Sequence, residues 1–193
     1  MAAFTGKALS VAELKEHLDL QPHPEGGLFK EVWRATEDIP QQSLPAAAGY
    51  DGPRCLSTHI YYMVTGKSFS AWHRIKQDEL WHYYTGSGGP LHVHMIDSKT
   101  GAYSVNKLGL NLAAGERPFF VVRGGDYFSS CLPDETVAAA AAAGATPVEE
   151  LYVLAGCTVA PGFDMADFEL PSRARMLELF PQHESIIRRL TRE

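Results

Sequence analysis

Two side chains that can exchange protons lie close together near the middle of the chain. His73 and Glu79 are separated by five residues, which lets the chain leave one strand, turn and return on its neighbour. A carboxylate beside an imidazole can orient the ring and favour its charged form, and the pair can then serve as general acid and base. We predict that His73 and Glu79 are catalytic. The plainer alternative is that they only bind a ligand or satisfy each other inside the fold.

Aromatic residues accompany this pair. If the period of two residues holds along each strand, Phe69 shares the face of His73, and Trp81 and Tyr83 share the face of Glu79. A cavity lined by such side chains suits a small polar ligand with a flat or sugar-like body. Trp81 and Tyr83 are therefore predicted to contact the ligand.

Three further histidines are assigned structural positions. His82 falls on the opposite face from Glu79, where we expect a structural hydrogen bond at a subunit contact, or a cavity role if a bulge shifts the phase. His92 and His94 are two residues apart on one strand and could face a metal together. Because Val93 and its apolar neighbours occupy the other face, we expect the two histidines to face solvent or a partner.

These residues are positioned by short strands. Segments of alternating, β-branched or aromatic character are separated by Gly, Pro, Asp or Asn turns. Such regular short strands without intervening helical patterns favour an antiparallel sandwich or barrel. The predicted strands span residues 28–34, 57–64, 68–73, 79–84, 91–97, 103–108, 119–122, 126–131 and 151–159.

Helical patterns occur at the two ends. Ser10 and Glu13 form a capping box before apolar residues at helical spacing, which predicts a helix over about 10–20. A second helical stretch covers about 172–190 and is interrupted by Pro181. We expect one domain over 1–193, with a barrel over about 28–160. The run of six alanines at 138–143 predicts a mobile surface excursion, because so short a helix is marginal in water.

A turn with the sequence HPEGG, residues 23–27, joins the first helix to a strand that carries Glu31, Trp33 and Arg34. Its two glycines permit backbone angles that other residues resist. Two interpretations stay open. The segment is either a rim that brings Glu25 over the barrel mouth, from this chain or a neighbouring subunit, or a plain turn between helix and strand.

The chain resembles a known family at these segments. Residues 66–86 follow the first motif of the cupin superfamily, in which a glycine, a histidine motif, a glutamate and a second glycine recur at set spacing. Agreement with the cupin-5 family, also called domain of unknown function 985, is carried by HPEGG at 23–27, IYYMV at 60–64, FSAWHR at 69–74, DELWHYYTG at 78–86 and LAGCTVAPGFDMADFEL at 154–170. This resemblance implies a double-stranded β-helix, or cupin jelly roll, and a homodimer.

The metal ligands of the superfamily are only partly present. Metal-binding relatives use two histidines and a glutamate of the first motif and a histidine of the second, and these positions hold His73, Ile75, Glu79 and Phe128 here. Two of four ligands remain, whereas a catalytic metal ordinarily needs three protein ligands and an open position. We expect no metal cofactor, a divalent ion held through His73 and Glu79 being the alternative.

Metal-free relatives imply a role for the remaining pair. A metal-free arrangement with His73 as acid or base resembles the division of labour in the sugar epimerases of the superfamily, in which a histidine removes a proton next to a carbonyl. This resemblance implies His73 as acid or base, Tyr127 or Tyr83 as proton donor opposite, and ligand contacts from Tyr127 and Phe128. We predict a metal-independent isomerase or epimerase of a sugar or sugar-nucleotide compound. The alternatives are a non-catalytic ligand-binding or sensing cupin and a metal-dependent oxygenase.

Composition restricts the partners. The net charge of −6 and an isoelectric point near 5.7 provide no general field for a nucleic-acid backbone. No run of 18 apolar residues occurs and the first residues lack the apolar core of a signal peptide, so we expect no membrane partner and a cytoplasmic location. Three widely spaced cysteines predict reduced, packed thiols.

Overall fold

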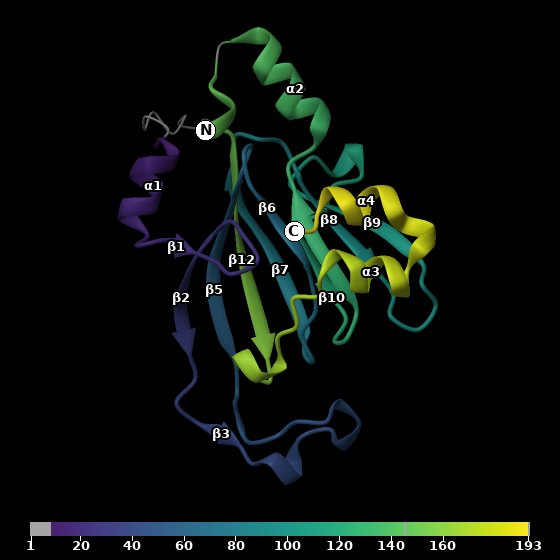
Figure 1. Cartoon of the computed structure of the whole chain (residues 1–193). Helices are drawn as coiled ribbons and strands as arrows, with labels where there is room; N and C mark the ends of the chain where they lie inside the picture. The colour runs from purple at the N-terminus through teal and green to yellow at the C-terminus, as the bar shows by residue number, and fades with distance from the viewer. Residues whose placement is uncertain (1–8, 145, 193) are drawn as a thin grey trace.

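Short strands rich in β-branched and aromatic residues pair into two main sheets and a small hairpin. The computed structural model describes residues 9–144 and 146–192 (Figure 1). Every pair of strands is antiparallel. The predicted all-β jelly roll with flanking helices is confirmed, and the ends of the predicted strands lie within two residues of those in the structure.

The larger sheet has six strands in the order β1-β2-β5-β12-β7-β10. Their bounds are Gln21–Pro22 (β1), Leu28–Arg34 (β2), Thr58–Thr65 (β5), Tyr152–Ala160 (β12), Asp78–Gly86 (β7) and Phe119–Val122 (β10). The second sheet has the order β6-β11-β8-β9, with bounds Phe69–His73 (β6), Tyr127–Cys131 (β11), Leu91–Ile96 (β8) and Tyr103–Leu108 (β9). The hairpin joins Asp38–Ile39 (β3) to Arg54–Cys55 (β4).

The apolar faces of the two sheets form one core. Alternation along each strand sends every second side chain inward, and the largest of these are fully buried. This cluster includes Tyr62, Trp81, Leu91, Val122, Phe128 and Val153. At one end of this core the inward side chains become polar, and the candidate functional site lies there.

Helices cover the outer surfaces. α1 (Val11–His17) is shorter than predicted but begins with the expected capping box of Ser10 and Glu13, and its Leu14 packs in a cluster with Met63 and Leu154. α3 (Arg173–Leu179) and α4 (Glu184–Arg189) are separated by a turn at Pro181. Both cover the outer face of the four-stranded sheet, where they enclose a second apolar cluster containing Trp72, Tyr127, Met176 and Ile187.

The alanine-rich segment lies on the surface, as predicted, but it forms a regular helix. Residues Asp134–Ala143 form the helix α2, which projects from the end of the molecule (Figure 1). Acidic residues in its first turn favour the helix by complementing its dipole, and Gly144 ends it in the left-handed conformation. None of its residues is fully buried. Among the described helices, none has the length and apolar character needed to cross a bilayer.

Candidate functional site

A β-bulge in β6 sets the position of His73. Opposite β11, Phe128 pairs with His73 and Ser130 pairs with Ser70, so three residues on β6 span two on β11. The extra residue reverses the alternation, and Ser70 joins His73 on the inner face. Strict alternation, which placed Phe69 on the face of His73, is wrong here, because Phe69 instead packs outward against the C-terminal helices.

The HPEGG segment, residues 23–27, brings Glu25 beside His73. The Ala71 N–H donates to the Glu25 carbonyl at 2.9 Å, which joins the segment to the edge of β6. Gly26 has φ of 115°, and a Cβ there would lie 2.2 Å from the Phe69 carbonyl oxygen, so only glycine fits this close approach. Glu25 is thus brought over the barrel by its own chain, as one of the two open interpretations predicted.

Glu25 and His73 form a close pair through one ring nitrogen of the imidazole. The His73 Nδ1 lies 2.7 Å from the Ala71 carbonyl oxygen, which can only accept, so Nδ1 carries a hydrogen. The His73 Nε2 lies 3.0 Å from Glu25 Oε2. The proton between these two atoms belongs either to a neutral carboxyl beside a neutral imidazole or to the imidazolium beside a carboxylate. One proton transfer therefore interconverts the two states of the pair.

Burial favours the neutral state of this pair. It lowers the pKa of His73 to about 4, although the bond to Ala71 opposes the change. Burial also raises the pKa of Glu25, against opposing effects of His23 and the hydrogen bond donated by Ser70 Oγ at 2.8 Å. The expectation that a carboxylate would favour a charged His73 is wrong at neutral pH, since the cost of burying the charge is larger.

Glu79 faces the same cavity without contacting His73. Within the described part of the chain, no hydrogen bond or ion pair joins these two residues, so the predicted role of Glu79 in orienting the imidazole is wrong and Glu25 has that place. Burial raises the pKa of Glu79 to about 8, and the nearby Glu25 adds to the effect. At neutral pH Glu79 is therefore mainly a protonated acid that can donate.

A second bulge builds the opposite wall. On β2, Glu31 pairs with Ile60 and Trp33 pairs with His59, which leaves Val32 as the extra residue. Glu31 and Arg34, three residues apart, then share the inner face. The guanidinium binds the carboxylate through two bonds, Nε to Oε1 at 2.9 Å and Nη2 to Oε2 at 2.7 Å.

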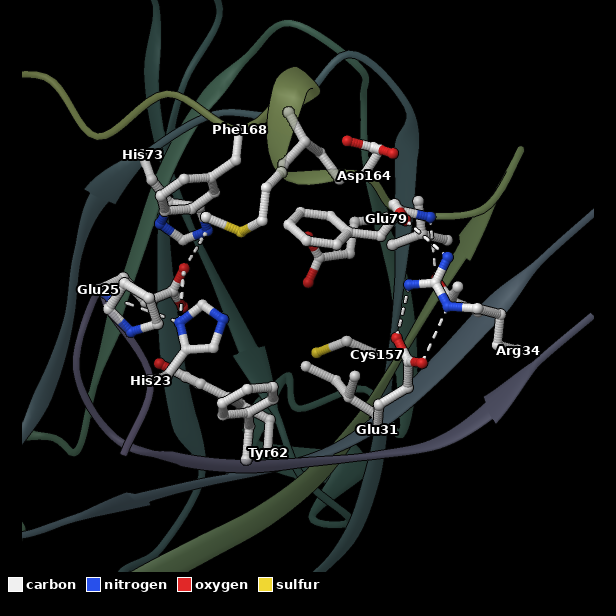
Figure 2. Close-up of a pocket in the computed structure, with 18 of the residues that line it drawn as sticks. His23, Glu25, Glu31, Arg34, Tyr62, His73, Glu79, Cys157, Asp164 and Phe168 are labelled. Atoms are coloured by element: carbon white, nitrogen blue, oxygen red, sulfur yellow. Dashed lines mark hydrogen bonds and ion pairs between the residues drawn. The ribbon is translucent and has the colours of Figure 1, made fainter. Parts of the chain in front are cut away.

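These groups line one cavity of about 510 Å³. In Figure 2, Glu25, His73 and His23 occupy one side, Glu31 and Arg34 occupy the other, and the Glu79 carboxyl points into the space between them. Cys157 also lines the cavity, and burial holds the pKa of its thiol well above the ordinary value. Apolar side chains complete the wall, among them Ile60, Ile75, Trp81, Val159, Phe163 and Phe168. The space is within the size range of small-molecule sites.

Of the residues predicted to contact a ligand, Glu25 and Trp81 line this cavity, whereas Tyr83, Tyr127 and Phe128 are outside its lining. Tyr83 is inward but packs against the main core. Phe128 supports His73 from behind, with ring centroids 4.0 Å apart.

Tyr127 points to the opposite face of β11 from Phe128 because the two are adjacent on the strand, and it packs against Phe180 in the outer cluster. The prediction of Tyr127 or Tyr83 as a proton donor opposite His73 is therefore wrong. The protonated Glu79 is the donor that the cavity offers instead.

His82 and His94 lie outside the cavity lining. His82 is on the outer face, where its Nε2 lies 3.1 Å from Thr158 Oγ1, in agreement with the predicted hydrogen bond. His94 was predicted to face solvent or a partner; a solvent-facing position is wrong, because His94 is buried, with Nδ1 2.6 Å from the Tyr103 hydroxyl and Nε2 3.4 Å from the Cys131 thiol. The C-terminal helices supply this cover, which the strand pattern alone does not reveal.

A metal ion does not fit the donors that are present. In residues 9–144 and 146–192, no three His, Cys, Asp or Glu side chains are grouped as metal ligands. Ile75 lines the cavity at the position of the second ligand, and Phe128 occupies that of the fourth. The remaining imidazole nitrogen of His73 is engaged by Glu25.

Several cavity residues escaped the sequence analysis. Glu31 and Arg34 were noted on their strand, but alternation gave no reason to place both inward. Tyr62 has its hydroxyl bonded to the Gly26 carbonyl at 2.8 Å and lies within the IYYMV segment, whose adjacent tyrosines point to opposite faces. No local signal in the sequence marks the two bulges that bring these residues to the inner face.

Comparisons with known proteins agree with this architecture. Residues 12–171 match a family model described as Cupin superfamily (DUF985). A hypothetical protein from Leishmania major is 30% identical, with a TM-score of 0.78 over 96% of this chain and 100% of that one. A protein from Shewanella oneidensis is 30% identical, with a TM-score of 0.77 over 96% of this chain and 99% of that one. No curated protein matches the chain.

Proposed function

The chain belongs to the cupin-5 family of the cupin superfamily, also called domain of unknown function 985, and we propose that it is a metal-independent isomerase or epimerase. Its substrate would be a small hydroxycarbonyl compound of sugar type. The observation that carries the proposal is the 3.0 Å contact between Glu25 Oε2 and His73 Nε2 in a wall of the cavity that Glu79 also lines. Together these groups supply a base and an acid on either side of one ligand.

The proton-accepting group is the pair of Glu25 and His73. When the shared proton moves to His73, the Glu25 carboxylate becomes free to accept a proton from the carbon next to a carbonyl. Ser70 Oγ donates to Glu25 Oε1 at 2.8 Å and keeps that carboxyl oriented. A positioned base of this kind contributes about 10² to 10⁴ in rate.

Glu79 acts as the matching acid. Its proton passes to the carbonyl oxygen while the carbon proton passes to the pair, and the product of this half-reaction is an enediol. In isomerisation the pair returns its proton to the neighbouring carbon, and the Glu79 carboxylate takes a proton from the other hydroxyl oxygen. In epimerisation a solvent proton adds to the opposite face of the same carbon, the Glu79 carboxylate takes back the proton of the hydroxyl that it formed, and the pair releases its proton to solvent.

Exchange of carbon-bound hydrogen with solvent tests the proposal. A panel of aldoses and ketoses is incubated with the protein in D₂O, and deuterium beside the carbonyl is followed by NMR. We expect incorporation that falls about 10² to 10⁴-fold in His73→Gln and Glu25→Gln. His82→Gln is the matched control, because that imidazole lies on the outer face of the sheet.

A sensing cupin is the competing outcome. Binding of a panel member without deuterium incorporation would contradict catalysis and favour a ligand-binding role for the same cavity. Exchange that survives unchanged in both Glu25→Gln and His73→Gln would place the chemistry elsewhere.

A further inference from the structure

The charges around the cavity are unusual for a site that binds sugar derivatives. Among the described residues that line it, Arg34 is the one side chain with a positive charge near neutral pH. Burial lowers the pKa of His23 and of His73, so neither imidazole adds a positive charge there. Arg192 lies nearby, but its guanidinium packs over the Phe69 ring outside the cavity lining.

Arg34 is already engaged by groups of the protein. Two of its N–H groups bind the Glu31 carboxylate, and Nη1 donates to the Phe163 carbonyl oxygen at 3.2 Å and approaches the Cys55 sulfur at 3.5 Å. Four of the five guanidinium donors are therefore occupied. One Nη2 N–H remains, so a phosphate or carboxylate would have to displace Glu31 to form two bonds with Arg34 and would then lie beside that anion.

The rest of the mouth adds negative charge. Asp164 lines the cavity and is exposed, and its Oδ1 accepts from the Ala166 N–H at 2.9 Å. Its carboxylate thus occupies the start of the short helical turn at Met165–Asp167, where backbone N–H groups would otherwise meet an anion. Anion sites in proteins rely on free Arg or Lys side chains or on open helix N-termini. The described lining offers neither.

We propose that Glu31 is a specificity residue that occupies Arg34 and excludes anionic ligands, so that the substrate is an uncharged hydroxycarbonyl compound and not its phosphate, carboxylate or nucleotide derivative. This statement rests on the proposed function for the nature of the reacting group, but the charge selection stands on the pairing of Glu31 with Arg34. The sequence predicted a sugar or a sugar-nucleotide compound as substrate, and this proposal selects the uncharged sugar.

Freeing Arg34 tests the inference. Binding of D-fructose, D-fructose 6-phosphate and inorganic phosphate is measured by isothermal titration calorimetry for wild type, Glu31→Gln and the double variant E31Q/R34Q. Both side chains are half-exposed, so the fold tolerates the changes, and thermal melting verifies this. Phosphate is included because its binding does not depend on the sugar being the natural one.

We expect wild type to bind the two phosphate-bearing probes too weakly to measure. Glu31→Gln should gain at least about tenfold in affinity for them, because the freed guanidinium forms charge-assisted hydrogen bonds with phosphate. E31Q/R34Q should lose that gain. Phosphate binding to wild type as tight as to Glu31→Gln, or no gain in Glu31→Gln, would overturn the inference. Absence of deuterium exchange with any sugar would instead count against the proposed function and leave this comparison intact.

Discussion

The carboxyl of Glu25 reaches His73 at 3.0 Å from a segment that lies outside the barrel strands. This contact gives His73 its partner and leaves Glu79 separate, so the two acids of the cavity have different tasks. In the proposed reaction the pair accepts a proton and Glu79 donates one. Tests of this division follow from the pKa of each group and from the contacts that hold the walls.

The pH dependence of activity should identify Glu79 as the acid. Because its pKa is raised to about 8, the group donates below that pH and loses its proton above it. We expect the rate of deuterium exchange to fall as pH rises through about 8. In Glu79→Gln the rate should be low and this alkaline limb should disappear. The same limb persisting in Glu79→Gln would assign it to another group.

Stability should also depend on the protonation of Glu79. Its folded pKa is raised from 4.5 to about 8, so the stabilisation is full below pH 4.5 and is lost as pH rises to about 8, by at most about 1.4 kcal/mol per pH unit. Glu79→Gln should therefore gain stability relative to wild type between pH 5 and pH 8. Urea unfolding at several pH values measures this, with exposed Glu16→Gln as control. A constant difference across this range would contradict the raised pKa.

The stability of the short helical turn Met165–Asp167, whose Met165 lines the cavity, should depend on a buried ion pair. Arg54 binds Asp167 through two bonds of 2.7 Å, and both side chains are almost fully enclosed. Asp167→Asn removes the buried counter-charge of the guanidinium and leaves only the exposed Asp51 carboxylate, so we expect a loss of about 3–5 kcal/mol in the free energy of unfolding. Asp51→Asn removes the exposed partner of the same arginine and should cost about 0–1 kcal/mol. Equal effects of the two substitutions would argue against a structural role of the buried pair.

A homodimer is expected to form through the outer face of the six-stranded sheet. Trp33 is 56% exposed on this face, together with the half-exposed rings of Tyr84 and Phe119. Large apolar groups gathered on one face mark interaction surfaces. Light scattering should give a dimer mass for wild type at micromolar concentration and a monomer mass for Trp33→Glu, with Val105→Glu on β9 as control. A monomeric wild type would refute this expectation.

The sequence predicts the strands well because each carries its own signal. Alternation and turn residues mark nine strands, whereas the two-residue strands β1, β3 and β4 contain too little pattern to detect. The inward positions of His73, Glu79 and Trp81 follow from the same alternation. The outward position of Tyr127 follows from it too, once Phe128 is known to be in the core.

The pairing of the site residues was harder to predict. A bulge in β6 and another in β2 each shift the alternation by one residue, and no local propensity marks either position. Glu25 meets His73 across 48 positions of sequence through backbone contacts of a turn. The lowered pKa of His73 depends on burial, which only the assembled walls create.

Residues 23–27 are attached to the edge of β6 but belong to none of the barrel strands, so the residues that form the barrel and the residue that pairs with His73 lie in different segments. The strands of the jelly roll supply His73, and the HPEGG segment, packed against the edge of β6, supplies Glu25. A substitution of Glu25 would therefore remove one half of the proposed proton-transfer pair and leave every barrel strand unchanged in sequence. Sequence changes confined to residues 23–27 offer an evolutionary route to a different reaction, or to the loss of the reaction, on the same barrel.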